Sequence, residues 1–174
     1  HASLVDAARA SRATLRVFRH NDLSHLSALL SRARGRERCL IVTEGVFSME
    51  GDACPLTGLV ELAEAHEAVV YLDDAHGAFV VGATGRGSPE AAGVPHERFL
   101  YMATLSKGLG AQGGFVVGPK TLIDFLRNRA RTFIYTTALA VPVAAAATAA
   151  LHLLTKEPQR REILRARTRQ LHGR

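Results

Sequence analysis

Short apolar runs alternate with amphipathic stretches along most of the chain. Residues 39–43, 68–72 and 98–103 are apolar runs of strand length, and each ends at a polar residue. Residues 56–63 repeat apolar side chains at helical spacing behind Pro55, and a second amphipathic stretch follows Asp22, a helix-capping residue type. Further helices are predicted over residues 121–131, 141–154 and 157–171. This alternation predicts an α/β fold: a mainly parallel sheet covered by helices on both faces.

One predicted strand departs from the parallel pattern. Residues 115–117 (FVV) follow the run 98–103 so closely that no crossover helix fits between them. We therefore expect this strand to pair antiparallel with its neighbour.

Polar residues stand where the predicted parallel strands end. Glu44, Asp73 and Thr104 each follow an apolar run directly. In open α/β sheets, ligands bind outside the carboxyl ends of the strands. We therefore expect these three positions to converge on one rim of the sheet.

Two dense motifs lie at this predicted rim and indicate a pyridoxal phosphate (PLP) site. Lys107 stands among hydroxyl residues and glycines in residues 104–114, and Asp73 is followed three residues later by His76. Such a site requires a lysine that bonds to the cofactor and a carboxylate that pairs with the pyridinium. It also requires hydroxyl and backbone N–H groups for the phosphate. Each residue alone has an ordinary structural explanation, but their joint occurrence in this order favours the PLP site.

Composition limits the other possibilities. The 174 residues are 47% apolar, enough for one globular domain, and contain no 18-residue apolar run that would indicate a membrane partner. Two widely separated cysteines indicate a reducing compartment, which we take to be the cytoplasm. We expect no metal site. His20, Asp22 and His25 resemble a metal cluster, but Asp22 is better explained as a helix cap.

The charge of the chain is concentrated near its end. Much of the net charge of +6 comes from arginines after residue 159. No aromatic residue is interleaved with them for base stacking, so we interpret them as a solvated helix face and expect no nucleic-acid partner. An anionic substrate carrier is the lesser alternative. Because the chain begins with His1, it has the look of a piece of a longer protein.

A glycine-rich stretch formally matches the dinucleotide fingerprint G-x-G-x-x-G. Residues 108–113 fit that spacing. The fingerprint must be followed by a helix, whereas the strand-like residues 115–117 come next. We expect these glycines to allow a tight backbone turn beside Lys107 instead.

Four segments together resemble one known family. Residues 42–52 (VTEGVFSMEGD), 73–77 (DDAHG), 85–87 (GRG) and 104–107 (TLSK) are similar to the α-oxoamine synthases, a group of fold-type I PLP enzymes. The similarity is greatest to the branch that serves biotin biosynthesis, which residues 1–4 and 20–22 also fit. The resemblance implies an aspartate aminotransferase-like large domain that is incomplete at both ends. Residues 1–155 would form its PLP-binding part, and residues 156–174 a basic helix leading toward a further C-terminal domain.

The resemblance also implies residue roles. Lys107 would be the Schiff-base lysine, Asp73 the partner of the pyridine nitrogen, His76 the donor to the ring 3-oxygen, and His1 a stacking residue on the ring face. The remaining cofactor-binding residues would be the phosphate-binding Thr104 with Ser106, Ser48 beside the cofactor, Glu44 ordering the rim, and Thr136 and Thr137, which reach the partner subunit's cofactor in a homodimer.

Three functions stay open at this point. The first is decarboxylating condensation of an amino acid, L-alanine, with a pimeloyl thioester in biotin biosynthesis. The second retains PLP but uses another reaction, as in glycine C-acetyltransferase or an aminotransferring relative. The third is a non-catalytic fragment that only retains the fold.

Overall fold

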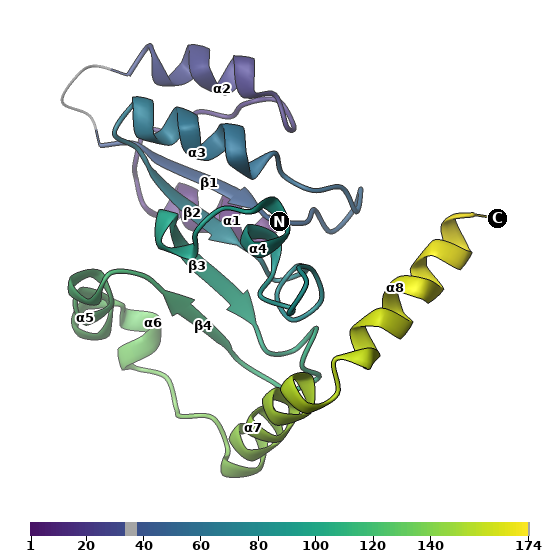
Figure 1. Ribbon diagram of the computed structural model, residues 1–174. Helices are drawn as coiled ribbons and strands as arrows, with labels where there is room; N and C mark the ends of the chain where they lie inside the picture. The colour runs from purple at the N-terminus through teal and green to yellow at the C-terminus, as the bar shows by residue number, and fades with distance from the viewer. Residues whose placement is uncertain (34–37, 174) are drawn as a thin grey trace.

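The computed structural model describes residues 1–33 and 38–173, and it builds one four-stranded sheet (Figure 1). The strands lie in the order β1-β2-β3-β4. The first three are parallel, and β4 pairs antiparallel with β3. This confirms the predicted sheet and its antiparallel strand. The strand bounds are Leu40–Glu44 (β1), Val69–Asp73 (β2), Phe99–Thr104 (β3) and Gly114–Val117 (β4).

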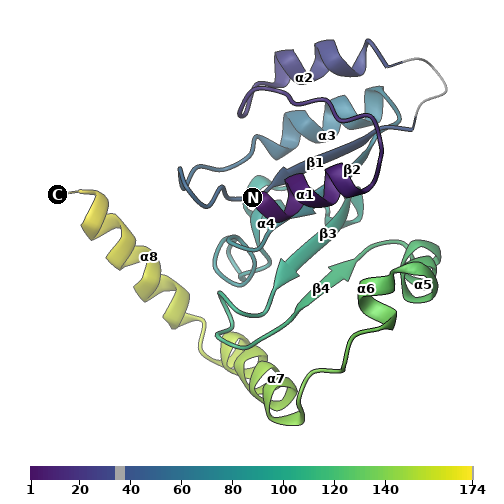
Figure 2. The same cartoon turned by 180° about the vertical axis from the view of Figure 1, so that it is seen from behind.

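Helices lie on both faces of the sheet. Helices α2 and α3 lie on one side, whereas α1 crosses the opposite face (Figures 1 and 2). Helix α2 begins as predicted, because the Asp22 carboxylate accepts a hydrogen bond of 2.8 Å from the His25 N–H. The first four helices are α1 (Ala2–Ala10), α2 (Leu23–Leu30), α3 (Leu56–Ala65) and the short α4 (Ser88–Ala92), and a 3-10 turn (His96–Arg98) precedes β3.

The second half of the chain is also helical. The helix predicted over residues 121–131 is divided at Ala130, whose ψ of 99° is extended, so that two helices form instead of one. Helix α8 points away from the sheet in both views (Figures 1 and 2). These helices are α5 (Lys120–Arg129), α6 (Arg131–Ile134), α7 (Val141–Lys156) and α8 (Gln159–His172).

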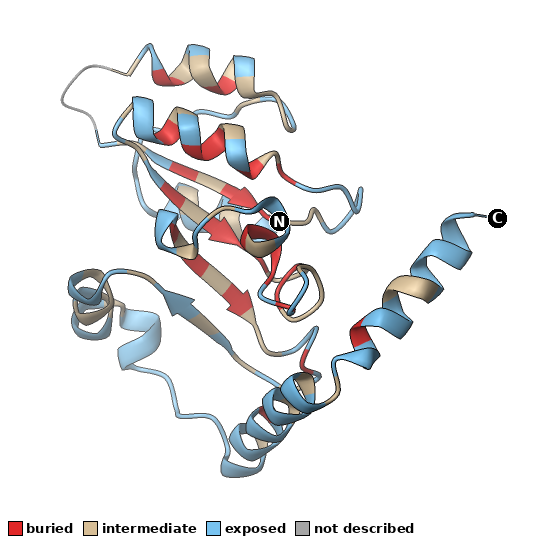
Figure 3. Cartoon of the chain, viewed as in Figure 1, coloured by how far each residue is buried: buried red, intermediate tan, exposed pale blue. Residues whose placement is uncertain are grey.

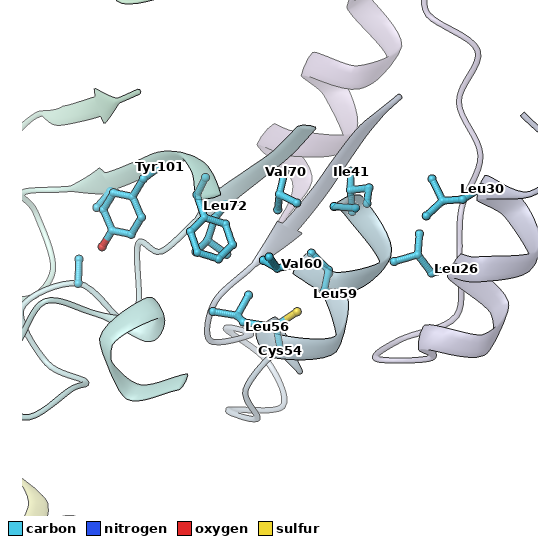
Figure 4. Packing of buried hydrophobic residues seen from close by; sticks show 14 residues of the cluster. Leu26, Leu30, Ile41, Cys54, Leu56, Leu59, Val60, Val70, Leu72 and Tyr101 are labelled. Atoms are coloured by element: carbon cyan, nitrogen blue, oxygen red, sulfur yellow. The ribbon is translucent and has the colours of Figure 1, made fainter. Parts of the chain in front are cut away.

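The core lies between the first three strands and the helices α2 and α3. Leu56 and Leu59 of α3 are almost fully buried against Val70 and Leu72 of β2 (Figure 4). The alternating burial of β3 is what a strand with one core-facing side produces. The same packing fixes where β1, β2 and β3 end, and therefore fixes the rim.

The register brings the predicted rim residues together. Glu44 pairs with Asp73 across β1 and β2, and Asp73 pairs with Met102, two residues before Thr104 on β3. The three polar strand ends therefore form one edge, as the alternation of strands and helices predicted.

The arginine-rich helix differs in one respect from the prediction of a solvated face. Arg161, near the start of α8, is buried at 9% exposure, whereas most of the helix is exposed. None of the helices in residues 1–33 and 38–173 is both long and apolar enough to cross a membrane.

Candidate active site

Asp73 is a buried carboxylate at the end of β2. Its side chain is 5% exposed, and its Oδ1 accepts a hydrogen bond of 3.0 Å from the Ala75 N–H. Burial raises the pKa of Asp73; the Ala75 hydrogen bond opposes the rise, and the charge of Glu44 adds to it. Its Oδ2 receives no hydrogen bond from the residues that the structure describes. A buried carboxylate with a free oxygen is suited to a cationic partner.

Lys107 and His76 meet although 31 residues separate them. Lys107 Nζ lies 2.9 Å from His76 Nε2. Lys107 follows β3 and His76 follows β2, so the adjacent ends of two parallel strands explain the contact. The Lys107 charge also lowers the pKa of Asp73, against the effect of burial. The two motifs that the sequence singled out therefore form one cluster.

The glycines after Lys107 allow the close backbone packing that was expected of them. A Cβ atom on Gly108 would lie 2.8 Å from the Ala78 carbonyl oxygen, which is too close for any side chain. Gly110 has a φ of 62°, in the left-handed region. The stretch is followed by strand β4 and not by a helix, which argues against a dinucleotide site as predicted.

Hydroxyl groups gather next to the lysine. Thr104 Oγ1 lies 2.7 Å from Ser106 Oγ and donates to the Gly113 carbonyl at 3.0 Å. The Ser106 N–H in turn donates to Thr104 Oγ1 at 3.2 Å. This arrangement orients two hydroxyls at the rim, where an anion such as a phosphate could be bound.

Asp74 is a buried carboxylate whose importance the sequence reasoning missed. It is fully buried and accepts hydrogen bonds from the Ser88 N–H, the Ser88 hydroxyl and the Tyr101 hydroxyl. These bonds tie the loop after β2, which carries His76, to β3. Burial raises the pKa of Asp74 because the charged form loses its water, and these hydrogen bonds oppose the rise.

A sequence signal for Asp74 was present in the glycines around it. A Cβ atom on Gly45, Gly77 or Gly87 would lie between 2.0 and 2.3 Å from an Asp74 carboxylate oxygen. The three glycines therefore leave the space that this carboxylate occupies. Gly45, Gly77 and Gly87 all belong to the motifs that carry the family resemblance.

Two other predicted site residues, His1 and Ser48, are not tied to the cluster by their side chains. The His1 main-chain nitrogen contacts the Glu44 carboxylate, so His1 lies at the rim. Its imidazole Nδ1 is 2.8 Å from Ser3 Oγ and caps α1. Ser48 is exposed in the turn after β1 and has no hydrogen bond among residues 1–33 and 38–173.

Thr136 and Thr137 are not brought to this cluster. Both are exposed on the segment between α6 and α7. Within the described ranges neither has a hydrogen bond to a rim residue. Their predicted role concerned a partner subunit, so their position in one chain does not test it.

His20, Asp22 and His25, the residues that resemble a metal cluster in the sequence, have other partners in the structure. His20 Nε2 lies 2.8 Å from Asp52 Oδ2, whereas Asp22 caps α2. Across the described part of the chain, no three histidine, cysteine or acidic residues are grouped as a metal would require.

Comparison with known proteins assigns the chain to a family. The model of the family "Aminotransferase class I and II" matches residues 1–174. The chain belongs to the class I and II aminotransferase family. An 8-amino-7-oxononanoate synthase from Methylobacillus flagellatus is 49% identical over 166 residues, which cover 95% of this chain and 42% of that protein.

Solved structures of the same family have the same fold. Serine palmitoyltransferase from Sphingomonas wittichii has a TM-score of 0.94 at 34% identity, covering 99% of this chain and 43% of that one. A structure of SPT with PLP has a TM-score of 0.93 at 37% identity, covering 99% and 44%. These findings confirm the fold class and the resemblance to the α-oxoamine synthases. The chain spans less than half the length of these relatives.

Proposed function

We propose that the parent protein is a PLP-dependent α-oxoamine synthase and that this chain supplies its cofactor lysine. The reaction condenses an amino acid with an acyl thioester and releases carbon dioxide and the free thiol. The 49% identity to an 8-amino-7-oxononanoate synthase supports L-alanine and a pimeloyl thioester as the substrates. The observation that carries the proposal is the cluster of Lys107, His76 and the buried Asp73 at one rim.

The described residues fit PLP. The free Oδ2 of Asp73 would accept a hydrogen bond from the protonated pyridine nitrogen, and pairing with that cation would relieve the cost of burying the carboxylate. Thr104 and Ser106 would bind the phosphate with the hydroxyls that they orient toward each other. His76 would donate to the ring 3-oxygen, and His1 would cover one face of the ring.

The bound cofactor supplies an electron sink for the bond that breaks at the substrate α-carbon. Asp73 strengthens that sink by holding the ring nitrogen protonated. Lys107 supplies the amine that bonds to the cofactor and, once released by the substrate amino group, accepts the α-proton at Nζ. His76 is within hydrogen-bonding distance of that nitrogen and orients it. Glu44, paired with Asp73 in the register, keeps the rim ordered.

The proposal includes a homodimer. Thr136 and Thr137 would reach the phosphate bound by the partner subunit, which agrees with their exposed position away from Lys107. Ser48 would face the cofactor from the turn after β1. The exposed apolar side chains of residues 133–141 would be covered at the same interface.

Chemical labelling tests the cofactor assignment. Borohydride treatment of the PLP-loaded parent, followed by peptide mapping, should place the pyridoxyl mass on Lys107. Lys120 is the matched control, since it is also exposed but pairs with Asp124 on α5. A label on Lys120 or Lys156 in place of Lys107 contradicts the assignment.

A second candidate keeps the cofactor and changes the amino acid. The TM-score of 0.94 to a serine palmitoyltransferase favours a broader α-oxoamine synthase chemistry, which includes glycine C-acetyltransferase. Exchange of the α-proton with solvent separates the candidates: we expect L-alanine to exchange faster than glycine or L-serine. Carbon dioxide should be released only after pimeloyl-CoA is added. Transfer of the amino group to a keto acid without loss of carbon dioxide would identify an aminotransferase instead.

A further inference from the structure

A mostly apolar pocket lies beside the cluster, between the loops after β2 and β3 and the helices α7 and α8. Its volume is about 240 Å³. Phe79, Leu109, Leu153 and Leu154 provide much of its lining, and Arg161 lies in its wall. Figures 1 and 2 both show the junction of α7 and α8 next to the turn that connects β3 to β4.

Arg161 is buried in this wall without a counter-ion. It is 9% exposed, and its Nη1 donates to the Leu154 carbonyl at 2.9 Å. Its Nε is the one buried side-chain nitrogen or oxygen in the described residues that has no hydrogen-bond partner. No carboxylate of the described chain lies within ion-pair distance of Arg161. Glu157, which also lines the pocket, pairs with Arg160 instead. A buried cation with an unused donor is costly unless an anion completes it.

Contacts with the loop after β2 hold Arg161 in place. Gly85, with a φ of 84°, lies so close that a Cβ atom there would be 3.1 Å from Arg161 Cδ and 3.3 Å from Nε. Arg165, one turn later on α8, donates to the Gly82 carbonyl oxygen. The loop after β2 thus holds the start of α8 in place and keeps the guanidinium at the pocket.

The lining indicates the chemistry of a ligand. An arginine guanidinium is suited to a carboxylate, and the leucine and phenylalanine side chains are suited to a hydrocarbon chain. The volume lies just below the roughly 300–1,000 Å³ of pockets for drug-sized ligands, so a short chain is favoured. The pocket is therefore suited to an aliphatic carboxylate.

The pocket is built from the same loops as the reactive cluster. Gly108 and Phe79 both line it; Gly108 is bonded to Lys107, and Phe79 follows His76 by three residues. Gly108 places one end of the pocket next to Lys107 in the chain, and Lys107 Nζ, 2.9 Å from His76 Nε2, is the amine proposed to act beside the carbon where the new bond forms. A chain that extends from that bond can enter the pocket.

We propose that the Arg161 pocket binds the distal carboxylate of the acyl group in a dicarboxylic acyl thioester. The inference rests on the proposed function and deepens it, since it names the residue that selects an acyl chain with a terminal carboxylate. Arg161 binds substrate at the end remote from the reacting carbon.

Substrate analogues test the inference on the unaltered, PLP-loaded parent. Pimeloyl-CoA and heptanoyl-CoA have the same chain length and differ in the terminal carboxylate. We expect kcat/KM to be at least ten-fold higher for pimeloyl-CoA. Equal values for the two thioesters would overturn the inference without any variant being made.

The Arg161→Gln variant then assigns the selectivity to this residue. We expect KM for pimeloyl-CoA to rise ten-fold or more, with KM for heptanoyl-CoA changed less than two-fold. Arg161→Lys, which keeps the charge and most of the stem, should show a smaller rise. Arg167→Gln is the matched control, because Arg167 is exposed on the same helix. Equal increases in both KM values, or no increase, would mean that Arg161 is structural only.

A binding measurement separates failure of this inference from failure of the proposed function. Calorimetry with heptanoate on the PLP-loaded parent should show binding, and the Arg161→Gln variant should weaken that binding at least ten-fold. The affinity for 1-heptanol, which lacks the carboxylate, should be the same in the parent and in the variant. If the parent catalyses condensation but its binding of heptanoate does not depend on Arg161, the pocket assignment is overturned. That result is expected if another segment of the parent fills the pocket. Heptanoate binding without condensation overturns the proposed reaction and, with it, the acyl-group assignment.

Discussion

The two halves of this chain differ in how completely they are packed. Residues 26–103 supply the hydrophobic cluster around β1, β2 and β3, and Leu72 and Ala103 are fully buried in it. After residue 103, Leu109 and Ala147 are the buried hydrophobic residues among those that the structure describes. In the same half Phe125, Phe133 and Val141 are 57%, 62% and 82% exposed. Figure 3 shows this contrast as red strands beside pale α5, α6 and α7.

The contrast shows which assignments one chain can support. Asp73, His76 and Lys107 lie at the ends of packed strands, so the core fixes their positions. Thr136 and Thr137 lie in the exposed half, where nothing in the described chain positions them. An apolar surface of this kind favours contact with more polypeptide. The proposed dimer supplies such a contact.

The largest difference should appear when a lysine at the packed rim and a lysine on an exposed helix are removed in separate variants. Lys107→Ala in the parent should lower the rate of carbon dioxide release by roughly 10³-fold or more, because both the cofactor bond and the base are lost. Lys120→Ala removes an exposed lysine of α5 and should leave the rate within two-fold. Similar rates for the two variants would show that the packed rim is not the reaction site.

A matched pair of aspartates gives the next largest effect. The Asp73→Asn variant keeps the shape of the side chain but loses its negative charge. The neutral amide cannot stabilise the protonated ring nitrogen. We expect turnover to fall by roughly 10²–10³-fold, the range found when one electrostatic group of a site is removed. Asp124→Asn on α5 is the control. Near-normal turnover of Asp73→Asn would mean that Asp74, or neither residue, is the partner of the ring nitrogen.

The sequence was sufficient to predict the packed half because its elements repeat with clear periods. The apolar runs before Glu44, Asp73 and Thr104 have strand length, and parallel neighbours end at the same rim. Lys107 and His76 followed from that topology together with their motifs. The register and the 2.9 Å contact between them come from the structure alone.

Other features had weaker signals. Helix α1 has no buried residue, so it lies outside the packed core that the apolar runs predicted. Arg161 was assigned to a solvated face because an arginine among arginines has no pattern that marks burial. Asp74 was marked only indirectly, by the glycines that make room for it. The burial of Arg161 and Asp74 depends on tertiary contacts between segments far apart in the chain.

A pair of apolar residues separates folding from assembly in the two halves. Leu59→Ala, at a side chain 1% exposed, should lower the free energy of unfolding of the parent by about 2–5 kcal/mol and leave its oligomeric state unchanged. Phe133→Ala should weaken the dimer at least ten-fold and change the stability of the protomer by about 0.5 kcal/mol or less. Denaturant unfolding and sedimentation velocity measure the two effects. A well-behaved monomeric parent with bound cofactor would contradict the dimer.

The smallest expected effect concerns the pH dependence of folding, and it again compares a buried aspartate, Asp74, with a partly exposed one, Asp124. Burial raises the pKa of Asp74 above its unfolded value of about 3.9, so the folded state binds the proton more tightly. The resulting stability is fully present below the unfolded pKa and is lost as the pH rises through the folded pKa. One such group changes the unfolding free energy by at most about 1.4 kcal/mol per pH unit. Urea unfolding of the cofactor-free parent across this window should therefore show a slope that Asp74→Asn flattens and Asp124→Asn preserves. An unaltered slope in Asp74→Asn would mean that the Ser88 and Tyr101 hydrogen bonds offset the effect of burial completely.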